Sequence, residues 1–167
     1  TLMESSGLDF TPPKDDKVVF YGGAGSVDFD KDGLDDLLFV TEKEVKLYKN
    51  IGSLNFIDIT SIAGLDLVNK GVSVHGFSIA DVNGDYFPDI FFCQNRVRLT
   101  DTTNNVYDTL NNSILFINKG DFTFEDQSQQ FGLSIPLMYG MSNFFDYDND
   151  GDLDLVVTSW PHGFDQN

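Results

Sequence analysis

Apolar residues gather in short runs along the chain, and polar loops that contain glycine separate these runs. Three runs are apolar without a break, Leu37–Val40, Ile90–Cys93 and Leu155–Val157, and each directly follows an acidic loop. An unbroken apolar run bounded by turn residues predicts a strand that is buried on both faces. No run reaches the roughly 18 apolar residues of a transmembrane helix.

The acidic loop before each of these strands recurs three times, as loop 1 (28–36), loop 2 (81–89) and loop 3 (146–154). Side-chain oxygens stand at the first, third, fifth and ninth positions of every copy, and the backbone carbonyl of the seventh residue is a further candidate ligand. The predicted ligands are Asp28, Asp30, Asp32, Leu34 and Asp36 in loop 1; Asp81, Asn83, Asp85, Phe87 and Asp89 in loop 2; and Asp146, Asp148, Asp150, Asp152 and Asp154 in loop 3.

Oxygen donors at alternating positions of a tight loop suit Ca²⁺, which takes about 6–8 oxygens at about 2.3–2.6 Å. The charge of the ion offsets the repulsion among the carboxylates. One such loop is also the ordinary composition of a solvated turn, but three copies with matching oxygens favour three calcium sites. The side chains of Asp35 and Asp152 fall outside the pattern. An EF-hand is excluded because the twelfth positions lack its glutamate and the flanks are strands.

A longer motif shows that the repeat extends beyond the loop. Residues Leu47–Leu65 align without gaps with Leu115–Leu133, and both copies contain Asn-x-Gly and end in Gly-Leu. Each unit therefore predicts four antiparallel strands, which is typical of a β-propeller blade. A single blade cannot bury both of its faces, so we expect the blades to stack. The predicted fold class is all-β.

The predicted units follow one another along the chain. Ser6-Gly7-Leu8 matches the blade exit Ala63-Gly64-Leu65, so we expect the chain to start where a blade ends. About two and a half blades cannot close a ring of about 4–8, and we expect further blades from the same chain or from neighbouring subunits. The predicted units are an entry segment (1–15), a blade (16–66), a blade (71–134) with a loop insertion (94–112), and a partial blade (137–167).

The charge and composition narrow the classes of partner. Ten basic and 27 acidic residues give a net charge of −17, which argues against nucleic acid and anionic membranes. The 41% hydrophobic content excludes a disordered acidic tail. Cys93 is the only cysteine, so there is no internal disulfide. The first residues lack the plan of a signal peptide, so we expect any targeting segment to be absent or already removed.

Catalytic motifs are missing from the sequence, and we expect a protein that is not an enzyme. There is no P-loop, dinucleotide fingerprint or nucleophile elbow. His75 falls on a predicted innermost strand, where a packed or channel-lining histidine is the simpler interpretation. His162 falls on a predicted loop beside Trp160, either as an ordinary loop residue or as part of a binding surface. Asn111 begins a glycosylation sequon inside the insertion.

Loops 1, 2 and 3 resemble the FG-GAP/VCBS repeats of calcium-binding β-propellers, as in integrin α-subunits. Their pairing with Leu47–Leu65 is most similar to propellers of the cartilage acidic protein and ASPIC/UnbV type. The resemblance implies a secreted or cell-surface calcium-binding module for adhesion, protein or glycan interaction, or extracellular structure. The alternative that it leaves open is the non-catalytic propeller of a larger secreted enzyme.

Two departures from the repeat pattern concern loop 2. Asn83 replaces an acidic residue, and Tyr86 stands at the sixth position, where glycine is usual, so we expect weaker binding there. A glycine precedes each loop, at Gly23, Gly76 and Gly140, and we expect it on the innermost strand, where small residues suit a narrow channel.

The insertion indicates where a partner binds. Successive connections of an antiparallel blade alternate between its two ends, so the insertion 94–112 leaves the end opposite the calcium loops. Long loops on a rigid scaffold commonly carry recognition. We expect a protein or glycan partner on this face, with Arg96, Arg98 and Tyr107 as candidate contacts.

Overall fold

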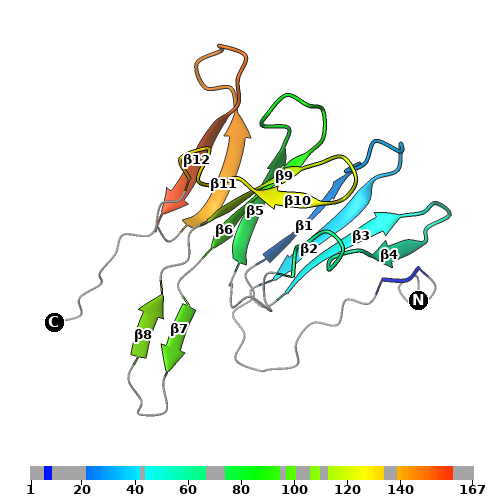
Figure 1. Ribbon diagram of the computed structural model, residues 1–167, viewed down its shortest axis with the longest axis horizontal. Helices are drawn as coiled ribbons and strands as arrows, with labels where there is room; N and C mark the ends of the chain where they lie inside the picture. Colours follow the sequence, from blue (N-terminus) through cyan, green and yellow to red (C-terminus); the bar gives the residue numbers. More distant parts are fainter. Residues whose placement is uncertain are drawn as a thin grey trace.

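The chain forms antiparallel sheets, and the predicted all-β class with four-stranded blades is confirmed (Figure 1). The computed structural model describes residues 6–8, 22–41, 44–66, 74–94, 97–100, 106–109, 113–133 and 139–159, and these contain strands and turns but no helix. The first sheet has the order β1 (Gly22–Val27), β2 (Asp36–Thr41), β3 (Val45–Asn50) and β4 (Phe56–Asp58).

The second sheet has the same arrangement as the first. Its strands, in order along the sheet, are β5 (Val74–Ala80), β6 (Asp89–Gln94), β9 (Ile114–Asn118) and β10 (Phe124–Asp126). Two smaller sheets complete the described structure. β11 (Tyr139–Phe145) pairs with β12 (Asp154–Ser159), and β7 (Val97–Thr100) pairs with β8 (Val106–Thr109). These strands fall inside the predicted units, whose limits stay a prediction; most of the entry segment lies outside the described residues.

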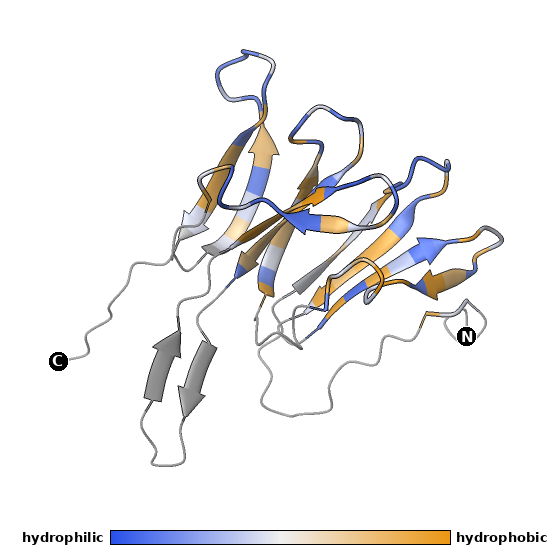
Figure 2. Cartoon of the chain, in the orientation of Figure 1, coloured by the Kyte–Doolittle hydropathy of each residue, from blue (hydrophilic) through white to orange (hydrophobic). Residues whose placement is uncertain are grey.

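The two four-stranded sheets and the β11–β12 sheet, here called the third sheet, stack face to face, and the second sheet lies in the middle (Figure 1). The side chains of successive residues in a strand such as β6 point to opposite faces of the sheet. Ile90 and Phe92 therefore join the core shared with the first sheet, while Phe91 and Cys93 join the core shared with the third. All six residues of β6 are buried. Figure 2 shows the apolar strands inside the stack and the hydrophilic loops at its end.

The other two apolar runs differ from the expectation of burial on both faces. In β2, Leu38 and Val40 are buried, whereas Leu37 and Phe39 are only half-buried. In β12, Val156 is 48% exposed. Within the part of the chain that the structure describes, only the second sheet has a neighbour on each face, so only its central strand is covered twice.

The first strands of the three sheets lie side by side, as the glycine pattern predicts. A Cβ atom added to Gly76 of β5 would lie 3.0 Å from the backbone oxygen of Gly140 on β11. A Cβ added to Gly23 of β1 would lie 3.1 Å from the ring of Phe77. A side chain at Gly76 would therefore press on the backbone of β11, and one at Gly23 would press on the Phe77 ring. A cavity of about 270 Å³ lies among them, and His75 lines it, as expected for a channel-wall residue.

The Asn-x-Gly motif ties the third strand of each four-stranded sheet to its acidic loop. The Asn50 amide donates to the backbone oxygen of Asp35 at 2.9 Å, and the Asn118 amide donates to that of Pro88 at 3.1 Å. These are equivalent positions of loops 1 and 2. Asn118 also donates to the backbone oxygen of Phe29 at 2.9 Å. Asn118 is buried and therefore links the second sheet to loop 1 of the first.

The insertion of the second blade forms a β-hairpin where a loop was expected. β7 and β8 pair from Val97 opposite Thr109 to Thr100 opposite Val106. The hairpin projects from the end of the stack opposite loops 1, 2 and 3, as the alternation of connections predicts (Figure 1). Arg98 lies on β7 and Tyr107 on β8, whereas Arg96 and Asn111 lie outside the described residues.

We expect Asn118→Ala to destabilise the protein by about 2–4 kcal/mol, because it leaves buried carbonyl groups without a donor. Asn50→Ala is the matched control, since its amide bonds only within its own blade, and it should cost about 1 kcal/mol. Urea denaturation of both variants measures the difference. Equal losses would show that the bond between the sheets contributes nothing.

Candidate metal centres

Loops 1, 2 and 3 connect β1 to β2, β5 to β6 and β11 to β12, and all three lie at one end of the stack (Figure 1). Each loop turns by placing its fourth and sixth residues in the left-handed backbone region. These residues are Lys31 (φ 63°) and Gly33 (87°), Gly84 (76°) and Tyr86 (72°), and Asn149 (61°) and Gly151 (95°). The three loops therefore share one backbone path, although their sequences differ.

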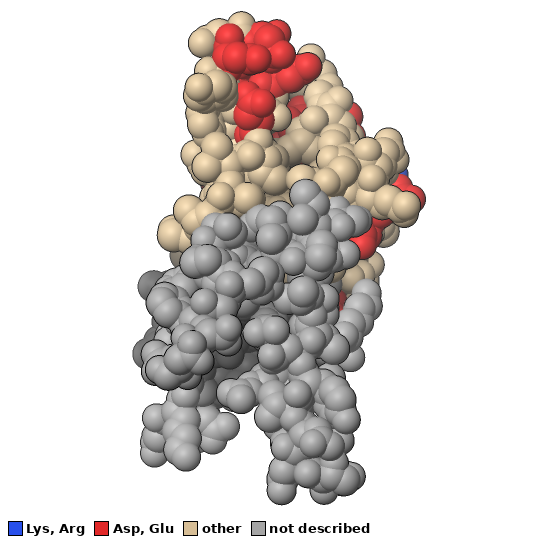
Figure 3. All heavy atoms as spheres, turned by 90° about the vertical axis from the view of Figure 1, so that its left-hand side faces the viewer, with Lys and Arg blue, Asp and Glu red and all other residues tan. Residues whose placement is uncertain are grey.

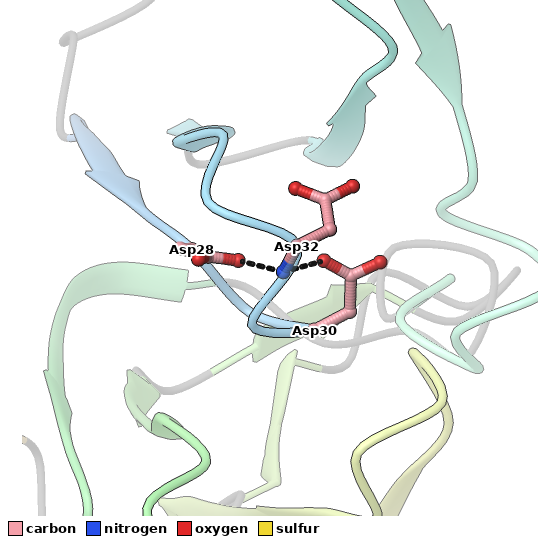
Figure 4. Close-up of side chains that lie close together, drawn as sticks. All are labelled: Asp28, Asp30 and Asp32. Carbon is pink, nitrogen blue, oxygen red and sulfur yellow. Dashed lines mark hydrogen bonds between the residues drawn. The ribbon is translucent and has the colours of Figure 1, made fainter.

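The first aspartate of each loop holds this path by accepting hydrogen bonds from the backbone. Asp28 accepts from the amides of Asp32 at 3.1 Å and Gly33 at 2.8 Å (Figure 4). Asp81 accepts from the fifth and sixth residues of loop 2 at 3.1 and 2.8 Å, and Asp146 from those of loop 3 at 3.1 and 3.0 Å. Such bonds draw the loop around the carboxylates.

The ninth aspartate of loops 1 and 2 lies at the boundary between loop and core. Asp36 is buried and accepts from the amide of Phe29 at 3.0 Å and that of Asn50 at 2.8 Å. Asp89 is also buried and accepts from Val82 at 2.9 Å and Asn118 at 2.9 Å. Each carboxylate thus joins its loop to the third strand of its sheet.

Burial shifts the titration of these two carboxyl groups. Loss of solvent raises the pKa of Asp36, and it raises the pKa of Asp89 to about 6 with a smaller contribution from the charges of Asp85 and Asp81. Hydrogen bonds from backbone amides offset the shift only in part. Backbone hydrogen bonds therefore compensate the negative charges of Asp36 and Asp89 only in part. A cation close to them would favour their charged forms.

Carboxylate oxygens converge in loops 1 and 3. One oxygen each of Asp28, Asp30 and Asp32 lies within 4.8 Å of the others, and the same holds for Asp146, Asp148 and Asp154. Two oxygens that bind one Ca²⁺ at about 2.4 Å cannot be more than about 4.8 Å apart, and both sets meet this requirement. Figure 3 shows acidic side chains gathered at the end of the molecule that carries loop 3.

Loop 2 brings its donors together differently. The Asn83 amide donates to the carboxylate of Asp85 at 2.8 Å, and the Asp85 backbone amide donates back to the Asn83 oxygen at 3.0 Å. Among the described residues, groups of three converging carboxylates occur only in loops 1 and 3. Loop 2 therefore offers fewer charged oxygens to a cation than loops 1 and 3. The weaker binding that its sequence predicts stays a prediction.

The remaining predicted ligands occupy equivalent places. The backbone amides of Leu34, Phe87 and Asp152 each donate at 2.9 Å to the aspartate two residues earlier, so the seventh residue is fixed beside the fifth in every loop. Asp35, which falls outside the oxygen pattern, accepts instead from the Ser26 hydroxyl at 3.3 Å.

Lys49 is a residue of the site that the sequence pattern did not reveal. It lies on β3, and its ammonium contacts Asp30 and lies 3.0 Å from Asp32. The hydrogen bond with Asp30 raises the pKa of Lys49, and the same ammonium lowers the pKa of Asp32. The only signal in the sequence is that Lys49 stands where the second copy of the motif has Ile117.

One comparison with known protein families gives a match. The family model described as FG-GAP-like repeat matches residues 28–92, from the first aspartate of loop 1 to the interior of β6. The match supports the FG-GAP repeat family for this stretch and does not extend to a particular type of propeller protein. No curated protein matches the chain. Among the described residues there is no helix long and apolar enough to cross a membrane.

We expect Tyr86→Gly to stabilise the protein by about 0.5–1 kcal/mol, because the left-handed backbone costs a residue with a side chain about 1–2 kcal/mol and glycine returns part of this as entropy. Tyr86 is 80% exposed, so little packing is lost. Thermal unfolding in excess EDTA measures the effect without metal.

The reverse change at the same position of loop 3 provides the control. A Cβ atom added to Gly151 would meet nothing within 4 Å, so Gly151→Ala tests the backbone alone. It should destabilise the protein by about 1 kcal/mol. A loss of stability in both variants would contradict the explanation from backbone conformation.

Proposed function

We propose that the chain is a non-catalytic, calcium-binding propeller module that works outside the cell as an interaction domain. Loops 1, 2 and 3 each hold one Ca²⁺, and the hairpin face at the opposite end binds a protein or glycan partner. The observation that carries the proposal is the backbone path shared by the three loops, together with the three carboxylates that loop 1 and loop 3 each bring within 4.8 Å of one another.

A solvated turn explains this geometry less well than a bound cation. Turn residues by themselves require only one or two aspartates, whereas each loop places an oxygen at the first, third, fifth and ninth positions. Carboxylates held this close destabilise a loop unless a cation lies among them. The raised pKa of the buried Asp89 points in the same direction.

The donor chemistry favours calcium over other metals. The predicted ligands are oxygen atoms alone, without the histidine or cysteine that zinc and copper prefer. Calcium accepts irregular sets of about 6–8 oxygens, whereas Mg²⁺ demands an octahedron of about 2.0–2.1 Å and keeps several waters. Extracellular modules bind calcium at about 0.1–1 mM, and we expect somewhat tighter binding in these loops because they carry many carboxylates.

Calcium should raise the thermal stability of the protein. If each site has a dissociation constant of about 10–100 µM, 1 mM Ca²⁺ adds roughly 1.4–2.7 kcal/mol per site to the free energy of unfolding. We expect Tm to rise by at least about 3 °C on adding calcium and to return after EDTA. Mg²⁺ at the same concentration is the control, and equal protection by Mg²⁺ would contradict the assignment.

The contribution of loop 3 can be tested separately. We expect Asp146→Asn with Asp148→Asn to remove one calcium ion per chain in isothermal titration calorimetry, because both carboxylates belong to the converging set. Asp35→Asn is the matched control, since it also removes a loop carboxylate but lies outside that set. An unchanged stoichiometry in the double variant would place the ion elsewhere.

The hairpin should contribute to partner binding but not to the calcium sites. β7 and β8 form a sheet of their own, so deletion of 97–109 should leave the calcium-dependent rise in Tm unchanged. Glycan-array binding by the intact chain should be lost after the deletion if the partner is a glycan. Binding that survives the deletion would place recognition on another face.

A further inference from the structure

The side chain of Lys49 lies between two blades and at the open side of loop 1. Lys49 follows Val45 and Leu47 on one face of β3, and these two residues are buried against the second sheet. Its ammonium contacts one oxygen of Asp30, lies 3.0 Å from one oxygen of Asp32, and lies 4.7 Å from the centre of the Phe122 ring. Phe122 belongs to the turn between β9 and β10 of the second sheet.

The oxygens that Lys49 contacts are those that the loop itself does not use. Oδ1 of Asp30 accepts from the backbone amide of Asp32, and Oδ1 of Asp32 accepts from that of Leu34. Lys49 takes Oδ2 of both aspartates. A calcium ion in loop 1 would take these same oxygens, because Oδ1 of each aspartate already accepts a backbone hydrogen bond. An ammonium and a divalent cation on the same oxygens repel one another, so the two cannot bind them together.

We infer that Lys49 is the internal counter-cation of loop 1: it holds Asp30 and Asp32 together in the calcium-free protein, and calcium binds this loop by displacing it. The inference rests on the proposed calcium binding. The Phe122 ring offers the displaced ammonium a second partner through a cation–π contact. Loop 1 consequently binds calcium more weakly than its own carboxylates would allow.

Among the three acidic loops, only loop 1 has a lysine paired with its aspartates in the part of the chain that the structure describes. The position of Lys49 is occupied in the second blade by Ile117, which is buried against the third sheet. No ion pair between described residues reaches loop 2 or loop 3. Loops 1 and 3 both carry aspartate at the first, third, fifth and ninth positions, and they therefore differ in affinity because Lys49 pairs with loop 1.

Calorimetry can isolate loop 1 in a chain that carries Asp81→Asn with Asp85→Asn in loop 2 and Asp146→Asn with Asp148→Asn in loop 3. Each substitution removes a charge, and asparagine keeps one of the two oxygens with which Asp81 and Asp146 accept backbone hydrogen bonds. In this background, Lys49→Met should tighten calcium binding by about 2–5-fold, the range expected for losing a competing, partly exposed ion pair. Lys46→Met is the matched control, because Lys46 lies on the same strand but pairs with Asp58 and Glu44.

The outcomes separate the inference from the proposed function. Equal or weaker affinity in Lys49→Met would overturn the role of Lys49 while leaving calcium binding intact. If neither chain binds calcium, the proposed function fails for loop 1, and the inference fails with it. Tighter binding in Lys46→Met as well would show a general effect of net charge and overturn the inference.

A second measurement uses the unaltered chain and reads the displacement directly. Acetylation of lysines by an amine-reactive ester, quantified by mass spectrometry, should be faster at Lys49 with saturating calcium than with EDTA, because the released ammonium is exposed. Lys46 should react equally in both. An unchanged rate at Lys49 in a sample whose Tm has risen with calcium would overturn the inference.

Discussion

A four-stranded sheet has two apolar faces and cannot bury either by itself, and this constraint organises the whole structure. Stacking meets it where neighbours exist. β6 of the second sheet sends Ile90 and Phe92 to one neighbour and Phe91 and Cys93 to the other, and every residue of the strand is buried. The inner strands approach so closely that a Cβ atom on Gly76 would lie 3.0 Å from the backbone oxygen of Gly140. The cores thus lie between blades rather than within them.

The acidic loops depend on this stack for their position. Asp36 and Asp89 sit where core and loop meet, and both bind the backbone of their own loop and of the third strand. Asn118 extends the connection to loop 1 of the neighbouring blade. The cores therefore hold loops 1 and 2 in position, whereas in loop 3 the exposed Asp154 accepts from the backbone amide of Tyr147 in its own loop.

Aspartates this close together repel one another, and the three loops differ in the groups that reduce this repulsion. Loop 2 replaces one carboxylate by Asn83, which donates to Asp85. Loop 1 receives the ammonium of Lys49 from β3. Among the described residues, loop 3 has no ion-pair partner and keeps three converging carboxylates. Loops with one backbone path can therefore differ in their need for a cation, because the groups around the path differ.

The strands, the loops and their repetition can be predicted from the sequence, because turn residues and apolar runs act over a few neighbouring positions. The sequence also marks Tyr86 as a departure from the usual glycine, and it predicts the side on which the insertion emerges. Which apolar runs are covered twice depends on packing, since β2 and β6 have similar sequences but, among the described strands, only β6 lies in a sheet with a neighbour on each face. Packing also places Lys49 against Asp30, a contact across 19 residues that no local pattern encodes. Burial and ion pairing depend on which surfaces meet, and only the packed chain brings those surfaces together.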